Sequence, residues 1–245
     1  TTERDATYLA KNNFDYSKTL ARFALERGAR FVYASSAATY GDGALGFSDD
    51  ESLIGRLRPL NGYGYSKQLF DGWLQRNGLL NQVAGLKYFN VYGPNEHHKG
   101  EMRSVVLKAF EQIRQNGAMT LFRSHHPDYQ DGEQLRDFVY VKDAAAMTLF
   151  FLEHPEANGL FNIGTGNARS WNDLASALFA ALRREPAVTY IDMPLELRPR
   201  YQYYTCADTA KLRKAGYRDE PTPLEEAVRD YVQGYLVPGR HLGDE

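Results

Sequence analysis

The sequence lacks several features that would by themselves define a class of protein. It holds a single cysteine, Cys206, so it can form no internal disulfide and no cysteine-rich metal site. Its 29 Lys and Arg against 31 Asp and Glu give a net charge of −2, unlike the strongly basic surface of a general nucleic-acid binder. It has no apolar run near the roughly 20 residues that cross a bilayer, and no signal peptide. We therefore expect a cytoplasmic protein without nucleic-acid or membrane partners.

What remains is an ordinary globular composition, with 43% hydrophobic and 24% charged residues. A length of 245 residues suits one large domain, or one domain with a smaller lobe. The sequence has no initial Met and enters an amphipathic pattern at residue 6. We expect from this that the chain was cut from a longer one.

Helical and strand patterns alternate along the chain. A helical pattern over 6–26 is stopped by Gly28, and an apolar run rich in strand formers follows at once. The same alternation continues, with strands expected at 30–36, 82–89, 138–141, 161–164 and 189–191 and helices at 63–75, 102–115, 143–154, 171–184, 208–215 and 223–236. Such an alternation predicts an α/β fold built on a parallel sheet.

Polar residues stand where these expected strands end. Ser35 and Ser36 close the first strand, and Asn90 follows the second. Ligands of open α/β sheets bind at the carboxyl ends of strands, so Ser36 is a candidate hydrogen-bond donor to a substrate oxygen. The alternative is that the two serines cap the following turn.

Tyr63 and Lys67 are four residues apart on an expected helix and therefore share one face. A nearby ammonium favours the phenolate, so Lys67 is expected to lower the Tyr63 pKa from about 10. Tyr63 is then a candidate general acid and base for an alcohol proton. The alternative is an ordinary pair on a helix surface.

Five motifs together resemble the extended short-chain dehydrogenases/reductases that modify nucleotide-linked sugars. They are S-S-A-A-T-Y-G at 35–41, Y-G-Y-S-K at 63–67, Y-F-N-V-Y-G-P at 88–94, R-D-F-V-Y-V-K-D at 136–143 and F-N-I-G-T-G at 161–166. Within that superfamily, N-N-F-D-Y-S-K at 12–18 and H-K-G at 98–100 are most similar to the ADP-heptose 6-epimerases. The resemblance implies a Rossmann-like doubly wound parallel sheet over 1–89 and 137–165. It also implies a smaller mixed α/β substrate-binding lobe over 90–136 and 166–245.

The resemblance also implies roles for single residues. Tyr63 and Lys99 match two acid/base positions, and Lys67 and Ser36 match residues that assist Tyr63. The cofactor-contacting positions are matched by Asn12, Lys67, Val91 and Lys99. The positions that hold the sugar nucleotide are matched by Asn90, Glu101, Lys108, Phe122, Arg123, Ser124, Arg136 and Tyr201. Glu101 and Lys108 depart from the family pattern, in which a small hydroxyl residue and a His are usual.

The implied reaction oxidises C6 of an ADP-linked heptose to a ketone and reduces it again on the opposite face. The cofactor would be NADP, with NAD as the alternative, the product a precursor of lipopolysaccharide, and the assembly a homo-oligomer, a pentamer in the family. The phosphate-cradling turn G-x-x-G-x-x-G is absent from the sequence. We therefore expect the first Rossmann segment to be missing and this polypeptide alone to bind cofactor poorly.

Other interpretations stay open. The chain could be another nucleotide-sugar epimerase or reductase, or a non-catalytic module that kept the fold; a 4,6-dehydratase is disfavoured because Ser36 is followed by two alanines. Lys99 could be a solvated loop lysine, and Arg136 could pair with Asp137 or Asp143. A metal site is disfavoured at the adjacent pairs His97, His98 and His125, His126, which lack a carboxylate or Cys at ligand spacing. We expect them to border the sugar pocket.

Overall fold

The computed structural model describes residue 3 and residues 5–244, apart from the side chain of residue 200. It divides into two compact units. Unit 1 comprises the chain up to residue 89 with 144–166 and 207–219, and unit 2 comprises 90–143, 167–206 and the chain from 220 onward. Among the described residues of both units, no helix is long and apolar enough to cross a bilayer.

The boundary after residue 89 coincides with the expected one, and two later boundaries differ. Strand β5 (Leu135–Tyr140) pairs with β3 (Asn90–Tyr92) and β7 (Ala168–Ser170), which places it in unit 2 instead of the cofactor domain. Helix α7 (Ala210–Lys214) contacts β6 (Gly159–Ile163), so 207–219 belongs to unit 1 instead of the substrate lobe.

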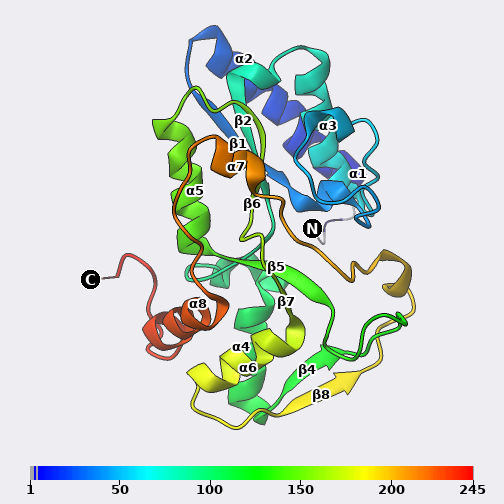
Figure 1. The fold of residues 1–245 in the computed structure, drawn as a ribbon, viewed down its shortest axis with the longest axis vertical. Coiled ribbons are helices and arrows are strands. Elements are labelled where there is room, and N and C mark those ends of the chain that lie inside the picture. Colours follow the sequence, from blue (N-terminus) through cyan, green and yellow to red (C-terminus); the bar gives the residue numbers. More distant parts are fainter. Residues whose placement is uncertain (1–2, 4, 245) are drawn as a thin grey trace. The chain divides into compact units, whose positions relative to one another are not determined.

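Unit 1 is built on a parallel sheet of the order β1-β2-β6 (Figure 1). Its strands are β1 (Phe31–Ser36), β2 (Val83–Tyr88) and β6. Ser36 aligns with Tyr88, and Tyr88 with Ile163, so the three carboxyl ends lie at one edge of the sheet. The helical segments of this unit are α1 (Ala6–Leu9), η1 (Ala10–Asp15), α2 (Tyr16–Glu26), η2 (Ala37–Tyr40), η3 (Glu51–Leu53), α3 (Gly62–Arg76), η4 (Leu80–Gln82), α5 (Val141–Glu153, counted here from residue 144) and α7.

Helices cover both faces of this sheet, which confirms the α/β, Rossmann-like prediction. On one face Phe70 and Leu74 of α3 pack with Val83 and Leu160 of the strands. On the other face Phe151 of α5 packs against Phe161, with ring centroids 4.6 Å apart. Alternate residues of a strand point to opposite faces, so Tyr33, Ser35 and Lys87 all face α3.

The single helix expected over 6–26 consists of three segments. The middle segment, η1, is a π-helix, in which each turn holds one residue more than an α turn. The apolar spacing of this region is compatible with a plain α-helix, so the sequence pattern gave no sign of the wider turn.

Unit 2 contains two small sheets and a helical core. The sheets have the orders β3-β5-β7 and β4-β8, with β4 at Met119–Phe122 and β8 at Val188–Ile191. Strands β3, β4 and β7 have three or four residues each and were not expected from the sequence, whereas the equally short β8 was. The helical segments are η5 (His97–Met102), α4 (Val105–Asn116), α6 (Trp171–Ala181), η6 (Arg198–Arg200), α8 (Leu224–Tyr231) and η7 (Val232–Leu236).

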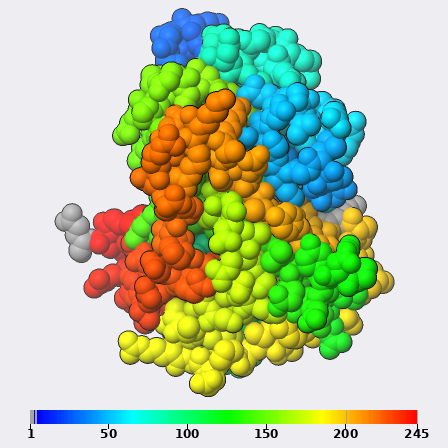
Figure 2. All heavy atoms as spheres, in the orientation of Figure 1, coloured from blue at the N-terminus to red at the C-terminus, as the bar shows by residue number. Residues whose placement is uncertain are grey.

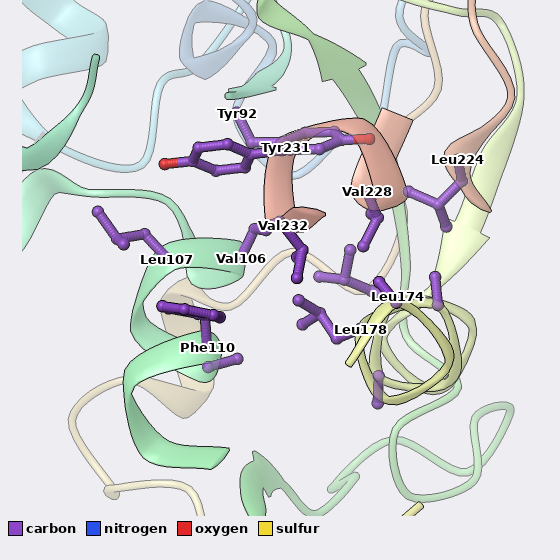
Figure 3. Packing of buried hydrophobic residues seen from close by; sticks show 14 of the residues in the cluster. Tyr92, Val106, Leu107, Phe110, Leu174, Leu178, Leu224, Val228, Tyr231 and Val232 are labelled. Atoms are coloured by element: carbon purple, nitrogen blue, oxygen red, sulfur yellow. The ribbon is translucent and has the colours of Figure 1, made fainter. Parts of the chain in front are cut away.

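The core of unit 2 lies between α4, α6 and α8. Figure 3 shows Val228 and Val232 directed toward Leu174 and Leu178 of α6. Local signals set the helix ends: Ser104 caps the start of α4, and Gly117 ends it with the left-handed conformation that glycine tolerates best. Burial of this apolar cluster is the main source of stability for the unit.

Candidate active site

The amino end of α3 brings Tyr63 close to the carboxyl end of β1. Asn61 caps the helix by accepting a hydrogen bond from the Gly64 amide at 2.8 Å. A Cβ on Gly64 would lie 2.7 Å from the Ala38 carbonyl oxygen and 2.9 Å from Pro59, so only glycine allows this approach. The first turn of α3 therefore packs against η2, the segment that begins directly after Ser36.

Ser36 caps the following turn, which was the alternative considered from the sequence, and it also interacts with Tyr63. Its hydroxyl accepts from the Ala38 amide at 3.1 Å and so caps η2. The same side chain makes a hydrogen-bonding interaction with Tyr63, which favours the phenolate. Ser36 and Tyr63 thus form a pair of neighbouring hydroxyls at the edge where the strands end.

Lys67 lies on the same face of α3, as expected, but does not act on Tyr63 as expected. Its Nζ donates to the Ala34 carbonyl at 2.9 Å and lies 5.9 Å from the centroid of the Tyr63 ring. Burial raises the pKa of Tyr63, and the interaction with Ser36 only partly offsets this. The prediction that Lys67 lowers the Tyr63 pKa is therefore wrong for this arrangement, because the ammonium is held by the strand.

The two asparagines of η1 differ in their contacts. Asn12, a predicted cofactor contact, is exposed and donates to the Tyr8 carbonyl of its own helix. Asn13 instead donates to the Ser66 hydroxyl at 2.9 Å, and Ser66 donates to the Tyr63 carbonyl at 2.7 Å. Asn13 therefore supports the backbone at Tyr63, a role that sequence reasoning missed.

A buried ion pair below this site was also missed. Asp71, one turn after Lys67 on α3, lies 2.8 Å from the Nζ of Lys87 on β2. Asp71 also accepts from the Ser35 hydroxyl at 2.7 Å. The sequence did contain a signal for this pair, because Lys87 is a charged residue within the apolar run of β2. A buried Lys requires a partner of opposite charge.

Unit 2 contains a pocket of about 370 Å³ that includes two of the predicted substrate residues. Phe122 at the end of β4 and Tyr201 after η6 both line it, together with Trp171 at the start of α6. The indole of Trp171 donates to the Tyr201 hydroxyl at 3.0 Å and so fixes both rings. The remaining lining residues are Val105, Gln112, Thr120, Leu121 and Ile191. A mostly apolar pocket with two oriented aromatic rings suits a flat ring system.

Arg136 lies beside these rings and is buried. Its guanidinium carbon is 5.1 Å from the Tyr201 ring and 5.7 Å from the Trp171 ring. It donates to the carbonyls of Leu135, at 2.8 Å, and Gln202. Burial lowers its pKa, and no carboxylate of the described residues lies within ion-pair distance. Pairing with Asp137 or Asp143, the alternative considered from the sequence, is therefore wrong.

Two other predicted substrate residues, Arg123 and Ser124, follow β4. Arg123 donates from Nε to the Tyr190 carbonyl at 3.4 Å. The Ser124 amide donates to Asp131 at 2.8 Å, which closes the base of the loop expected at 124–133. Figure 2 shows this loop in green on the surface of unit 2, where 125–128 are exposed.

The other predicted residues of unit 2 lie on β3 and around η5. Asn90 is exposed and Val91 half-buried on β3, and Lys99 is exposed on η5, which replaces the loop expected there. Glu101 and Lys108 form an ion pair at 3.2 Å. The two positions that depart from the expected family pattern therefore complement each other in charge.

Three of the four histidines make separate contacts in unit 2, and His98 is exposed. His97 faces the His241 ring at 5.4 Å, and His125 lies 4.0 Å from Asp192. His126 packs against Tyr203, with ring centroids 5.0 Å apart. Within the described residues, no three His, Cys, Asp or Glu side chains gather as a metal site would require.

Comparison with known proteins gives a consistent assignment. The chain is 59% identical over 237 residues to an ADP-L-glycero-D-manno-heptose-6-epimerase of Nitratidesulfovibrio vulgaris strain Hildenborough, covering 97% of this chain and 73% of that protein. A protein of the same name from Fusobacterium nucleatum is 49% identical over 246 residues, covering 97% and 74%.

A similar solved structure is that of the ADP-L-glycero-D-manno-heptose-6-epimerase of Helicobacter pylori. It superposes with a TM-score of 0.77 at 29% identity, covering 96% of this chain and 68% of that one. The family described as NAD dependent epimerase/dehydratase matches residues 1–164. This chain is a member of the NAD dependent epimerase/dehydratase family.

Proposed function

We propose that this chain carries the acid/base residues of an enzyme that converts ADP-D-glycero-D-manno-heptose to its L-glycero epimer at C6. The observation that carries the chemistry is the interaction of Ser36 with Tyr63 at the carboxyl edge of the sheet. The identity to relatives that bear the name of this epimerase carries the choice of substrate. The product would serve the synthesis of lipopolysaccharide.

In this proposal Tyr63 exchanges a proton with the C6 oxygen, and Ser36 donates a hydrogen bond to the same oxygen. Burial keeps Tyr63 a neutral phenol before substrate binds, because the phenolate loses solvation. A phenol is the form that donates a proton when a ketone is reduced. The reverse step requires the phenolate, which Lys67 favours if its ammonium leaves the Ala34 carbonyl.

The donors near Tyr63 fit one end of a nicotinamide cofactor. A half-buried ammonium on Lys67 stands beside two hydroxyls at the sheet edge, a set suited to a ribose and a reacting alcohol. The glycine-rich turn that cradles a pyrophosphate is not among the 245 residues. A nicotinamide held there would supply the acceptor and the donor of the C6 hydride. We propose NADP, with NAD the alternative, and contacts from Asn12, Lys67, Val91 and Lys99.

Inversion requires that the ketone turn its opposite face toward the nicotinamide before the hydride returns. The C6 oxygen changes place when the ketone turns, and we assign the proton donor of this second orientation to Lys99. Lys99 is exposed on η5 and belongs to no ion pair of the described residues, so its ammonium is available.

We assign recognition of the nucleotide to unit 2. Arg136 is buried without a carboxylate partner, and a planar guanidinium binds phosphate oxygens in a bidentate manner. The aromatic pocket beside it suits an adenine ring. The remaining proposed substrate contacts are Asn90, Glu101, Lys108, Phe122, Arg123, Ser124 and Tyr201. We further propose a homo-oligomer, a pentamer as in the family.

The test is conversion of ADP-D-glycero-D-manno-heptose by the full gene product that contains these residues, followed by NMR of the C6 configuration. Tyr63→Phe and Lys99→Ala are compared singly and together with the wild type. Each single variant should lose about 100-fold or more in kcat, the usual contribution of a general acid or base. Tyr65→Phe, on the same helix but exposed, is the matched control and should retain activity.

The outcomes separate the parts of the proposal. A wild type that is inert on this heptose but epimerises another nucleotide sugar would refute the substrate and leave the chemistry. A Lys99→Ala variant with full activity would refute the second acid/base role alone. Loss of activity in Tyr65→Phe equal to that in Tyr63→Phe would show that the assay reports folding.

A further inference from the structure

The charged network around Asp71 in unit 1 has no role in the mechanism described so far. Asp71 and Lys87 have side chains only 1% exposed, and their charged atoms are 2.8 Å apart. Asp71 accepts three hydrogen bonds, from the Tyr33 hydroxyl at 2.9 Å, the Ser35 hydroxyl at 2.7 Å and Lys87. A buried ion pair contributes little net stability compared with apolar residues of similar volume, so its presence asks for another explanation.

The network holds the chain on both sides of Ser36. On the preceding side, the Ser35 hydroxyl is bound to Asp71. On the following side, Lys87 donates to the Thr39 hydroxyl at 2.7 Å, and Thr39 donates to the Ser36 carbonyl at 2.8 Å. Asp71 therefore holds the residue before Ser36, and Lys87 holds the Ser36 carbonyl through Thr39. The two members of one ion pair thus restrain Ser36 from both sides.

The network also acts on the lysine beside Tyr63. Tyr63, Lys67 and Asp71 follow one another at intervals of four residues, so they lie along one face of α3. Burial lowers the pKa of Lys67, and the negative charge of Asp71 opposes that effect. The negative charge of Asp71 therefore favours the ammonium form of Lys67.

We propose that Asp71 is a positioning residue for the Ser36, Tyr63 and Lys67 set, with Lys87 as its counter-ion. Asp71 holds Ser36 in place through Ser35, and its carboxylate stands one turn beyond Lys67 on the same face of α3. Lys87 contributes through Thr39, and it neutralises Asp71 so that the carboxylate is tolerated in the core. This inference rests on the proposed acid/base role of Tyr63.

Few other charges can take over this role. The elements that pack against α3 present Tyr8 of α1, Lys11 and Asp15 of η1, Tyr33 of β1 and Tyr40 of η2, and the neighbouring strand β2 presents Lys87. Of these, Asp15 already pairs with Lys18 at 2.9 Å, and Tyr33 and Tyr40 have pKa values well above their ordinary value because they are buried. Asp71 is the group whose charge raises the Lys67 pKa.

The experiment measures kcat for the epimerisation against pH in the full gene product with Asp71→Asn, Lys87→Met and the double variant. Asp71→Asn should lower kcat about tenfold or more, since small displacements of reacting groups have effects of this size. It should also move the alkaline limb of the profile to lower pH, because Lys67 loses its ammonium more readily. Lys87→Met should lower kcat through Thr39 and leave that limb in place or at higher pH.

The double variant keeps the test valid if Asp71→Asn or Lys87→Met alone fails to fold. It removes both charges together, so neither remains buried alone. It should fold and still show the alkaline limb at lower pH than the wild type. An unchanged limb in the double variant, with kcat within about twofold of the wild type, would overturn the proposal.

Arg30→Met is the matched control for a purely structural defect in the same strand region. Arg30 directly precedes the amino end of β1, which is opposite to the end that carries Ser36. It donates to the carbonyls of Phe151, at 2.9 Å, and Ala157, at 2.7 Å. It should lower the melting temperature and leave the shape of the pH profile unchanged. A shift of the limb in Arg30→Met equal to that in Asp71→Asn would also overturn the proposal. An inactive wild type would instead refute the proposed function.

Discussion

Tyr231 of α8 donates a hydrogen bond from its hydroxyl to the buried carboxylate of Glu96, 3.1 Å away. Glu96 also accepts from the amide and the hydroxyl of Ser104, both at 2.6 Å. The carboxylate therefore ties the start of α4 to α8. The segment η5, which carries Lys99, lies in the chain between Glu96 and Ser104.

Removing the Tyr231 hydroxyl should destabilise unit 2. Tyr231→Phe leaves Glu96 with one partner fewer in a buried place, which should cost about 1–3 kcal/mol of unfolding free energy. Urea titration followed by circular dichroism measures it. Tyr92→Phe is the control, because Tyr92 is a buried neighbour in the same core (Figure 3) and its hydroxyl bonds to no described residue. Equal losses in both variants would contradict the expectation.

Substituting Gly64 by alanine should separate Tyr63 from Ser36. The added methyl group meets the Ala38 carbonyl and Pro59, so the first turn of α3 must move away from η2. We expect a loss of about 1–3 kcal/mol in stability, as for other overpacked sites, and a fall in kcat. Gly72→Ala in the same helix is the comparison, since its Cβ would lie 3.1 Å from the flexible end of Arg76 and at an ordinary contact distance of 3.7 Å from Ile54. Unimpaired turnover in Gly64→Ala would show that the close approach is dispensable.

Replacing Arg136 by methionine should reduce nucleotide binding far more than stability. The variant removes a buried cation that has no carboxylate partner, so the lost hydrogen bonds to two carbonyls are offset by relief of a desolvated charge. Calorimetric titration with ADP should show affinity lower by about tenfold or more, because charged hydrogen bonds contribute about 1.5–3 kcal/mol each. If ADP affinity is kept while the melting temperature falls steeply, Arg136 is structural.

The stability of unit 2 should depend on pH through Glu225. Arg169 bonds to it at 2.6 Å, and that hydrogen bond is the main reason why the Glu225 pKa is lowered. A carboxylate with a depressed folded pKa adds stability above its unfolded pKa of about 4.3, and that stability is lost as pH falls through the folded value.

Glu225→Gln should therefore cost less than about 1 kcal/mol at pH 7, since the pair is partly exposed, and a smaller amount at pH 2–3. Guanidinium unfolding at both pH values checks this. A difference from the wild type that is as large in acid as at neutral pH would show that Glu225 acts through packing.

Much of the fold follows from the sequence where one pattern extends over many residues. Strand formers in β1 and β2, and long amphipathic segments in α3 and α4, are signals that packing reinforces. The short strands β3, β4 and β7 were missed because three or four residues carry little alternation, whereas β8, equally short, was expected from its run of strand formers. The pairing of distant segments decides them.

The candidate site shows the same limit. Ser36, Tyr63 and Lys67 stand in motifs, so their types and spacing identify them. The Asp71–Lys87 pair joins a helix to a strand, and neither residue stands in one of the motifs. Only the folded structure therefore reveals the pair. The Tyr63 pKa also depends on burial, and burial comes from distant residues.

The π-helix η1 makes the first helical region tolerant of a change in chain length. A π turn is an α turn with one residue inserted, so deletion of one residue within 10–15 would allow a regular α-helix to continue from α1 into α2. The wider turn takes up the extra residue, so the side chains beyond the deletion would keep nearly their present direction. A deletion within the regular α turns of α2 would instead rotate the residues that follow it by about 100° around the axis. Ala21, which is fully buried against the sheet, would therefore stay there after a deletion in η1. A one-residue alignment gap at η1 would mark a relative that packs its first helix in the same way and has a plain α turn in place of the wider one.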